Sequence, residues 1–413
     1  MISKFLNFLK NNKLYFLINE YRYRSIIQSL QNKNKINVVF LINHISQWKY
    51  HSLFNIYKNN KRYSVKIIFV PVDNFGTNYL NDYKFNKNEF KKIGINLVSS
   101  YNISKRIWKN INKTFSPDII FFSRSLTKSK FRYKIFDFNK SLNVYVPYSL
   151  FTDNNDKLQC ATLFHKLLWK QFLPYKLNLD IAKKFYDSKN IVITDYPGCD
   201  VFKLKNFSNK YWKKKENKKI IWAPHHTIEY PSQKNYFSTF LFFHKSMKEL
   251  SIKYKNSIDF CFKPHPVLKK KLYNHKDWGV KKTNEYFDFW NKSENTILSE
   301  SGYQDLFIQS DALILDSISF MAEYLYLKKP YCFLTKKKYS YTSSLNIIGK
   351  KIFKTINKAN DLKSLDHFIV NSVIRNIDLN KKNRIKVLND LNYLSKDNLS
   401  ASQIIFNYID SKI

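Results

Sequence analysis

Residues 312–324 read ALILDSISFMAEY, in which a short apolar run is followed by Asp316, Ser317 and Ser319 and then by a helical pattern. An apolar run of this length predicts a strand that is buried on both faces, as in a parallel sheet. Aspartate and serine commonly begin helices, so the segment predicts a strand, a tight connection and a helix. This unit is typical of α/β proteins.

The same alternation of apolar runs and helical patterns extends in both directions from this segment. In the second half we expect strands at 220–223, 258–263, 296–298 and 331–334, a short helix ending at 306–310, and helices at 238–253 and 319–327. In the first half we expect strands at 36–42, 65–70, 95–98, 117–122, 143–146 and 191–194, and a helix over about 160–184. The tail from Asp361 to Ile413 has a helical pattern. These intervals predict two parallel α/β sheets.

The formal net charge of +40 in 413 residues needs an explanation. Nucleic acid, an anionic membrane surface and an acidic substrate would each attract such a chain. A codon bias toward Lys, Asn, Ile, Phe and Tyr is the alternative without a partner. Basic residues are dispersed and no nucleic-acid motif is recognised, so binding to nucleic acid is the remote reading.

Cysteine usage and hydropathy exclude two further classes. The four cysteines include no CxxC pair, so a structural zinc site is not expected, and Cys261 and Cys332 lie in apolar runs typical of a core. The sequence contains no stretch of 18 apolar residues, so no membrane-spanning helix is expected.

The Lys-rich segment Met1 to Leu30 carries Phe, Leu and Ile at helical spacing. It predicts either a helix that packs on the protein or a basic amphipathic helix on a membrane.

Polar residues follow three of the predicted strands of the second half, where open α/β sheets bind ligands. At the segment quoted above, Ser317 and Ser319 and the free N–H groups of a helix N-terminus suit a phosphate or a diphosphate, with helix capping as the structural alternative. Glu323 lies one turn after Ser319 and could accept a bond from a ribose hydroxyl, or be a solvated helix residue.

Histidines follow the other two strands. In Lys263-Pro264-His265-Pro266 the prolines fix the backbone around His265, which can then donate to a phosphate or exchange a proton, while Lys263 adds charge. His225, His226 and Thr227 follow the strand at 220–223. Because adjacent side chains in an extended loop point apart, we expect one of these two histidines to be spare.

The order and spacing of these segments resemble the CDP-glycerol glycerophosphotransferase family, whose members polymerise teichoic acids and related capsular polymers. The resemblance rests on Trp222-Ala-Pro224, on Lys263-Pro-His265-Pro, on the run from Asp311 to Phe320 and on Leu327-Lys-Lys-Pro330, within residues 190–340. It implies the GT-B fold: an α/β protein with two Rossmann-like domains facing each other across a cleft, here with helical N- and C-terminal segments. It also implies that His265 is the active-site histidine, that Ser317 and Ser319 contact the donor diphosphate after Asp316, and that no metal or other cofactor is needed.

The domains expected on this basis are a basic helical segment (1–35), an acceptor-side domain (36–190), a nucleotide-donor-binding domain (191–390) and a C-terminal helix (391–413). The boundary between the two large domains is expected between about Lys184 and Lys219. The family's first-domain motif, a histidine-glycine before Pro-Leu-Lys, is absent, and Val146-Pro147-Tyr148-Ser149 stands at the corresponding place. The first-domain candidates are therefore His44, a potential base after the first strand, and Tyr148 and Asp153.

Three functions follow. The first is transfer of glycerol phosphate, or a similar polyol phosphate, from a CDP-activated donor to a cell-surface polysaccharide or teichoic-acid-like acceptor, in the cytoplasm at the inner face of the membrane. The second is a GT-B glycosyltransferase that uses a CMP-sugar or another nucleotide sugar for capsule or lipooligosaccharide, because sialyltransferases and capsule Kdo transferases share related histidine and serine motifs. The third, from another class, is a basic nucleic-acid-binding protein.

Overall fold

The fold is described from a computed structural model of the chain. The structure describes residues 13–70, 79–125, 133–203, 212–214, 216–228, 237–300, 302–336, 340–391 and 399–413, and the side chains of residues 13–16 are not included. The chain divides into two compact units. Unit 1 comprises Met1–Leu150, Asn155–Asp200 and Asn392–Ile413, and unit 2 comprises Phe151–Asn154 and Val201–Leu391.

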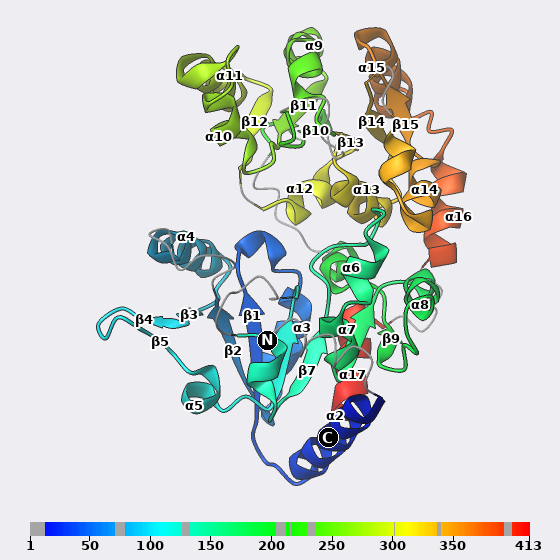
Figure 1. The fold of residues 1–413 in the computed structure, drawn as a ribbon. Helices are drawn as coiled ribbons and strands as arrows, with labels where there is room; N and C mark the ends of the chain where they lie inside the picture. The colour runs from blue at the N-terminus through cyan, green and yellow to red at the C-terminus, as the bar shows by residue number, and fades with distance from the viewer. Residues whose placement is uncertain are drawn as a thin grey trace. The chain divides into compact units, whose positions relative to one another are not determined.

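Unit 1 is built on a seven-stranded parallel sheet in the order β3-β2-β1-β6-β7-β8-β9 (Figure 1). Its strands are β1 (Ile36–Ile42), β2 (Tyr63–Phe69), β3 (Leu97–Ser99), β6 (Ile119–Phe122), β7 (Leu142–Tyr145), β8 (Lys170–Leu173) and β9 (Ile191–Ile193). A small antiparallel hairpin joins β4 (Tyr101–Asn102) and β5 (Ile107–Trp108). The central strand β1 is apolar and buried along most of its length, as a strand covered on both faces requires.

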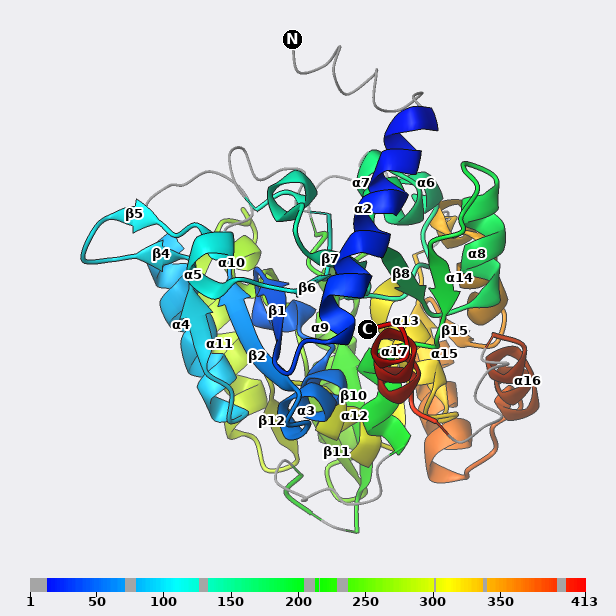
Figure 2. The same cartoon turned by 90° about the horizontal axis from the view of Figure 1, so that it is seen from below.

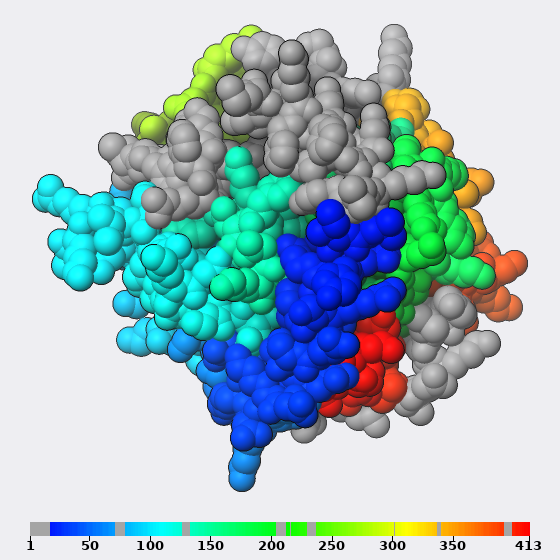
Figure 3. Space-filling view, turned by 60° about the horizontal axis from the view of Figure 1, so that its bottom comes forward, coloured from blue at the N-terminus to red at the C-terminus, as the bar shows by residue number. Residues whose placement is uncertain are grey.

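The described helices of unit 1 are α2 (Lys13–Gln31), α3 (His51–Asn59), α4 (Tyr79–Lys92), α5 (Ile111–Phe115), α6 (Asp156–Cys160), α7 (Leu163–Leu167), α8 (Lys176–Lys183) and α17 (Ala401–Asp410). Helices α2 and α17, far apart in sequence, lie side by side on one face of the unit (Figures 2 and 3). Arg62 joins their ends, since its guanidinium donates to the carbonyls of Leu30 (3.2 Å) and Ile413 (3.1 Å).

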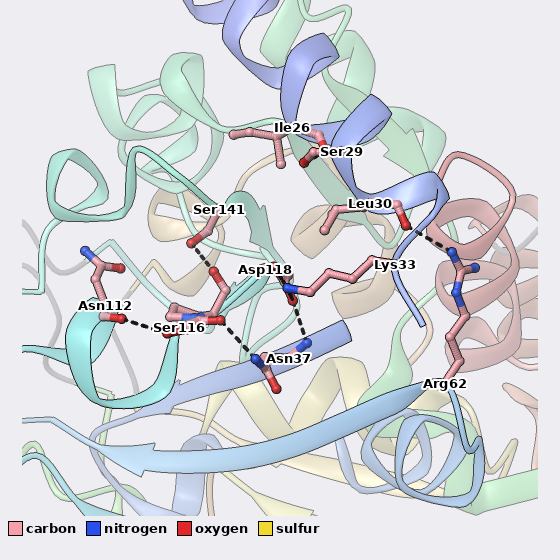
Figure 4. Close-up of polar contacts among 11 residues, drawn as sticks. Ile26, Ser29, Leu30, Lys33, Asn37, Arg62, Asn112, Ser116, Asp118 and Ser141 are labelled. Carbon is pink, nitrogen blue, oxygen red and sulfur yellow. Dashed lines mark hydrogen bonds and ion pairs between the residues drawn. The ribbon is translucent and has the colours of Figure 1, made fainter. Parts of the chain in front are cut away.

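The amino-terminal edge of this sheet is tied to the residues that follow α2 (Figure 4). Both carboxylate oxygens of Asp118 lie 2.7 Å from the Lys33 ammonium, and one of them accepts the N–H of Asn37 at 2.8 Å. Tyr23 and Leu30 on the inner face of α2 are buried in the core of the unit. The expected N-terminal helix is therefore confirmed as a packing helix over its described part, and residues 1–12 lie outside the described residues.

Unit 2 is built on a six-stranded parallel sheet in the order β12-β11-β10-β13-β14-β15. The strands are β10 (Lys218–Ala223), β11 (Ile258–Phe262), β12 (Thr296–Leu298), β13 (Ala312–Leu315), β14 (Tyr331–Leu334) and β15 (Asn357–Ala359). The described helices are α9 (Phe240–Lys253), α10 (Leu268–Tyr273), α11 (Gly279–Lys292), α12 (Gln304–Gln309), α13 (Ile318–Leu325), α14 (Ile347–Phe353), α15 (Leu362–Phe368) and α16 (Lys381–Leu391).

Aromatic side chains fill the core on one side of this second sheet. Trp222 of β10 stacks on Phe262 of β11, with ring centroids 4.9 Å apart, and on Phe240 of α9 at 5.7 Å. The ring centroid of Trp290 in α11 lies 5.3 Å from that of Phe262. Each fully buried side chain of this size contributes about 2–3 kcal/mol relative to exposure, so the cluster stabilises β10 and β11, the strands that precede the histidine segments.

Two sequence expectations about elements are wrong. The continuous helix expected over 160–184 is instead α6, α7, strand β8 and α8, because Pro174 disfavours helix at the residue before it and the buried Gln171 bonds to neighbouring segments. Strand β15 was not expected, because Asn357-Lys358-Ala359 carries no apolar run. The thiols of Cys261 and Cys332 lie in the core, as expected.

The attachment of α17 to unit 1 generates a stability prediction. The buried Asp200 carboxylate accepts the N–H groups of Ala401 and Ser402, both at 2.9 Å, at the positive end of the helix dipole. We expect Asp200→Ala to lower the free energy of unfolding by about 1–2 kcal/mol and to speed amide exchange in α17. Asp187→Ala is the control, since Asp187 forms only an exposed pair with Lys189 and should change stability by less than about 0.5 kcal/mol. Equal effects of the two variants in urea unfolding would contradict this role of Asp200.

Candidate active site in the second unit

Four neighbouring strands of the second sheet, β11, β10, β13 and β14, end at the same edge because they run parallel. The segments that follow the first three contain the histidines and serines singled out from the sequence. His265 follows β11, His225 and His226 follow β10, and Asp316 and Ser317 follow β13. The pairing of these strands therefore brings the three sequence segments to one edge.

The three histidine rings form one cluster. The ring centroid of His265 lies 4.2 Å from that of His226 and 5.2 Å from that of His225, and His225 and His226 lie 4.3 Å apart. One nitrogen from each ring lies within 4.8 Å of the others. The premise that the two adjacent side chains point apart is wrong, because both rings lie against His265, and the expectation that one of them has no function stays a prediction.

Hydrogen bonds fix the tautomers of two of these rings. The Nδ1 atom of His265 accepts the main-chain N–H of Val267 at 3.2 Å, so the proton of the neutral ring is on Nε2. The Nδ1 atom of His225 lies 2.9 Å from Oγ1 of Thr227, which already accepts the N–H groups of Phe237 and Ser238. The Thr227 hydroxyl therefore donates a hydrogen bond to Nδ1 of His225, so the proton of the neutral His225 ring is on Nε2.

His225 is neutral at physiological pH. Burial lowers the pKa of His225 to about 2, and neighbouring His226, His265 and Lys271 add to this lowering. A neutral imidazole with its proton on Nε2 is a hydrogen-bond donor and not a base. His225 and His265 thus offer Nε2–H groups at a strand edge, which suits a phosphate oxygen.

The same three histidines are the described group whose spacing could hold a metal ion. A metal binds the lone pair of an imidazole nitrogen, and coordination through Nε2 requires the proton on Nδ1. In His225 and His265 the Nδ1 atoms accept hydrogen bonds from Thr227 and Val267. The ring proton is therefore on Nε2, which leaves no lone pair there for a metal. The donor set as it stands fits an anion better than a cation.

Asp316 lies beneath the cluster and is fully buried. One carboxylate oxygen accepts the main-chain N–H of His225 at 2.5 Å, and the other accepts the main-chain N–H (2.5 Å) and the hydroxyl (2.9 Å) of Thr239. Burial raises the pKa of Asp316 to about 6, while these hydrogen bonds act to lower it. Asp316 therefore holds the β10 loop and the start of α9 to the end of β13, and does not point toward a ligand.

The helix start after Asp316 has the form predicted from the sequence. Ser317 is the N-cap of α13, yet its side chain makes no capping hydrogen bond, so simple capping does not account for it. Ser319 lies in the first turn and is exposed. Glu323 is buried and accepts a hydrogen bond from the Tyr303 hydroxyl, so the alternative of a solvated helix residue is wrong.

The remaining candidates have structural partners. Lys263 is buried and its ammonium donates to the carbonyl of Ser299 at 3.2 Å.

In unit 1, Nδ1 of His44 accepts the N–H of Ser46 at 3.1 Å and so caps the turn Ile45–Gln47. Burial lowers the pKa of His44. The carbonyl of Tyr148 accepts the Tyr196 hydroxyl at 2.6 Å. Asp153 forms a β-bridge with Leu345 within unit 2. A catalytic role for His44 stays a prediction.

Sequence reasoning missed three residues at this edge: Thr239, Tyr303 and Lys336. Thr239 and Tyr303 precede helices α9 and α12, and a search for residues at helix starts would have found them. Lys336 follows β14 by two residues, one strand beyond the segments considered.

Residues 176–348 match the model of a protein family described as CDP-Glycerol:Poly(glycerophosphate) glycerophosphotransferase. The resemblance predicted from the sequence is confirmed. The matched segment lies mostly in unit 2 and contains all three histidines. The prediction of a CDP-glycerol glycerophosphotransferase-like transferase is confirmed at the level of this family. No curated protein sequence matches the chain.

Solved structures confirm the GT-B fold. A variant of the wall teichoic acid polymerase TagF is similar with a TM-score of 0.60 at 12% identity, over 97% of this chain and 98% of that one. A UDP-GlcNAc 2-epimerase from Neisseria meningitidis, bound to UDP-GlcNAc, is similar with a TM-score of 0.55 at 13% identity, over 91% of this chain and 100% of that one. At these identities the likeness concerns the fold alone.

The raised pKa of Asp316 predicts a pH dependence of stability. A buried acid whose pKa rises from 3.8 to about 6 contributes most to stability below pH about 3.8, and this contribution is lost as the pH rises through about 6. The loss corresponds to about 3 kcal/mol. We expect the free energy of unfolding of the wild type, relative to Asp316→Asn, to fall by this amount between about pH 3.5 and about pH 7.

Urea unfolding across this range measures the difference directly. Asp277→Asn is the matched control, because the Asp277 side chain is 68% exposed and its substitution should give a nearly constant difference. A constant difference for Asp316→Asn as well would show that Asp316 ionises as a solvated carboxylate does.

Proposed function

We propose that the chain transfers glycerol phosphate, or a similar polyol phosphate, from a CDP-activated donor to a cell-surface polysaccharide or teichoic-acid-like acceptor. The observation that carries the proposal is the convergence of two Nε2–H imidazoles and the start of α13 at one sheet edge, inside the segment that matches the family. Phosphate oxygens are the ligands for which N–H donors and a helix N-terminus are suited.

In the proposed reaction the donor diphosphate lies over this edge. The acceptor hydroxyl attacks the β-phosphorus, a new P–O bond forms, and the bond from the β-phosphorus to the bridging oxygen breaks so that CMP leaves. A histidine acting as base takes the hydroxyl proton, and His44 remains our predicted candidate. The Nε2–H groups of His225 and His265, with Ser317 and the α13 N-terminus, stabilise the charge on the transferred phosphoryl oxygens and on CMP.

A similar solved structure supports the choice of donor class. One TagF structure similar to this chain, with a TM-score of 0.54 and 12% identity, was obtained with CDPG. Within unit 2, the buried Glu323 of α13 accepts a hydrogen bond from the partly buried Tyr303, and a ribose hydroxyl of the donor would compete with Tyr303 for this carboxylate. The second candidate donor, a CMP-sugar, presents a phosphate to the same edge.

Replacement of His265 tests the proposal. We expect His265→Ala to lower the rate of CMP release from CDP-glycerol by about 100-fold or more, because one preorganised donor to a phosphoryl group is lost. The control is His367→Ala, which removes an exposed histidine of α15 in the same unit and should leave the rate unchanged. Turnover near the wild-type rate in His265→Ala would show that the assignment is wrong. Thermal stabilisation by UDP or GDP but not by CMP would reject a cytidine donor.

We also propose that the protein contacts the anionic inner face of the cell membrane through α2. No helix among the described residues is long and apolar enough to span a bilayer. The N-terminal half of α2 nevertheless presents apolar side chains to solvent, with Leu17 60%, Ile18 56% and Tyr21 77% exposed, beside the exposed Arg24. Exposed apolar side chains of a helix favour the interface of a bilayer, and Arg24 offers a cation to anionic headgroups on the same surface as the exposed Glu20.

Vesicle binding tests this surface. We expect the wild-type chain to co-sediment with phosphatidylglycerol vesicles and the double variant Leu17→Glu, Ile18→Glu to bind at least about fivefold less, since two apolar contacts become repulsive charges. Leu379→Glu is the control, because Leu379 is 87% exposed in unit 2. Equal binding by both variants would show that α2 is not the contact.

A further inference from the structure

A diphosphate diester carries two negative charges, and His225 does not help to balance them. His225 is neutral, and a neutral imidazole donates hydrogen bonds without adding positive charge. The one lysine identified from the sequence, Lys263, is buried and its ammonium is directed to the carbonyl of Ser299. A site for a dianion at this edge therefore needs cations from other elements.

Lys336 lies at one side of the edge. It follows β14, which pairs with β13, and its side chain is half-buried. The ammonium is close enough to Asp316 for the carboxylate to stabilise its charge, and it lies 6.0 Å from the ring centroid of Phe242 in the first turn of α9. Burial lowers the pKa of Lys336 to about 8, so the amine is still largely protonated near pH 7. An incompletely solvated ammonium gains more from an added anion than a solvated one does.

Lys271 lies at the other side. It belongs to α10, which begins three residues after His265 and follows β11. Its ammonium is near enough to His225 to help lower the pKa of that histidine. β11 and β14 are the outer two of the four neighbouring strands, so the segments that carry Lys271 and Lys336 follow strands on opposite sides of β10 and β13.

We propose that Lys271 and Lys336 bind the diphosphate of the nucleotide donor from two sides, and supply positive charge that the neutral His225 lacks. The inference rests on the proposed function for the identity of the donor. It assigns separate roles at the same site: the imidazole N–H groups orient the phosphoryl oxygens, and the two lysines determine affinity for their charge. Lys336 also stands beside the exposed Phe242, so the charge it supplies lies next to an apolar surface.

The test compares ligands that differ only in their phosphates. Titration calorimetry gives the dissociation constants of CDP-glycerol, CDP and cytidine for the wild type and for Lys271→Met and Lys336→Met. We expect each variant to bind CDP-glycerol and CDP at least tenfold more weakly, to bind cytidine as the wild type does, and to show a weaker dependence of CDP affinity on salt. Lys336→Arg keeps the charge and should stay within about threefold of the wild type.

Two exposed lysines of the same unit are the controls. Lys270→Met changes the residue next to Lys271 on α10, and Lys354→Met changes the residue that follows α14. Both should bind CDP-glycerol as the wild type does. Thermal unfolding checks that each variant is folded, and if Lys336→Met does not fold, Lys336→Gln takes its place.

The outcomes separate this inference from the proposed function. If the wild type binds CDP-glycerol and the two methionine variants bind it within twofold as tightly, the role of the lysines is wrong while the donor assignment stands. If the wild type does not bind CDP-glycerol, the proposed function fails. Inorganic pyrophosphate then serves as the probe: its weaker binding by both variants would support the lysine pair, and unchanged binding would overturn it.

Discussion

The hydrogen bonds of the buried Asp316 carboxylate hold the candidate site together. One side chain at the end of β13 accepts the main-chain N–H groups of His225 and Thr239 and the Thr239 hydroxyl, and so joins a strand end, a loop and the start of α9. Because a carboxylate has two oxygens with room for several donors, it can satisfy three groups that would otherwise be buried without partners. Its raised pKa records the cost of placing a charge there. The hydrogen bonds from the main chain of His225 and from Thr239 offset part of this cost, and they also hold His225 in position.

From this arrangement follows the chemical character of the site. Thr227 and the Val267 N–H each direct a proton to Nδ1 of a histidine, which leaves the Nε2–H group of each ring as a donor. Neutral donors orient an anion without holding it strongly, and cations hold it without orienting it as closely. The division of roles between the imidazoles and Lys271 and Lys336 combines both properties. The GT-B fold itself does not decide this, since a polymerase and an epimerase share it at similar TM-scores.

Much of the fold and part of the site could be predicted from the sequence. Apolar runs such as 36–42 and 312–315 are strands because such runs must be buried on both faces. Strand β8 could not be predicted, since Lys170-Gln171-Phe172-Leu173 contains the polar Gln171, whose amide bonds to Cys160 and Tyr186 in other segments. Likewise, the position of His226 against His265 depends on the turn after Pro224, and Lys336 enters the site only through the pairing of β14 with β13. These contacts are tertiary and leave no periodic signal in the chain.

The most direct measurement is a crystal structure of the chain with CDP-glycerol. The account predicts that oxygens of the diphosphate lie within about 3 Å of Nε2 of both His225 and His265, as hydrogen bonds to a phosphate require. A diphosphate bound away from the β11, β10 and β13 ends would contradict the account. So would a metal ion bound between the three imidazoles in place of the phosphate, because it would require the opposite tautomers of His225 and His265.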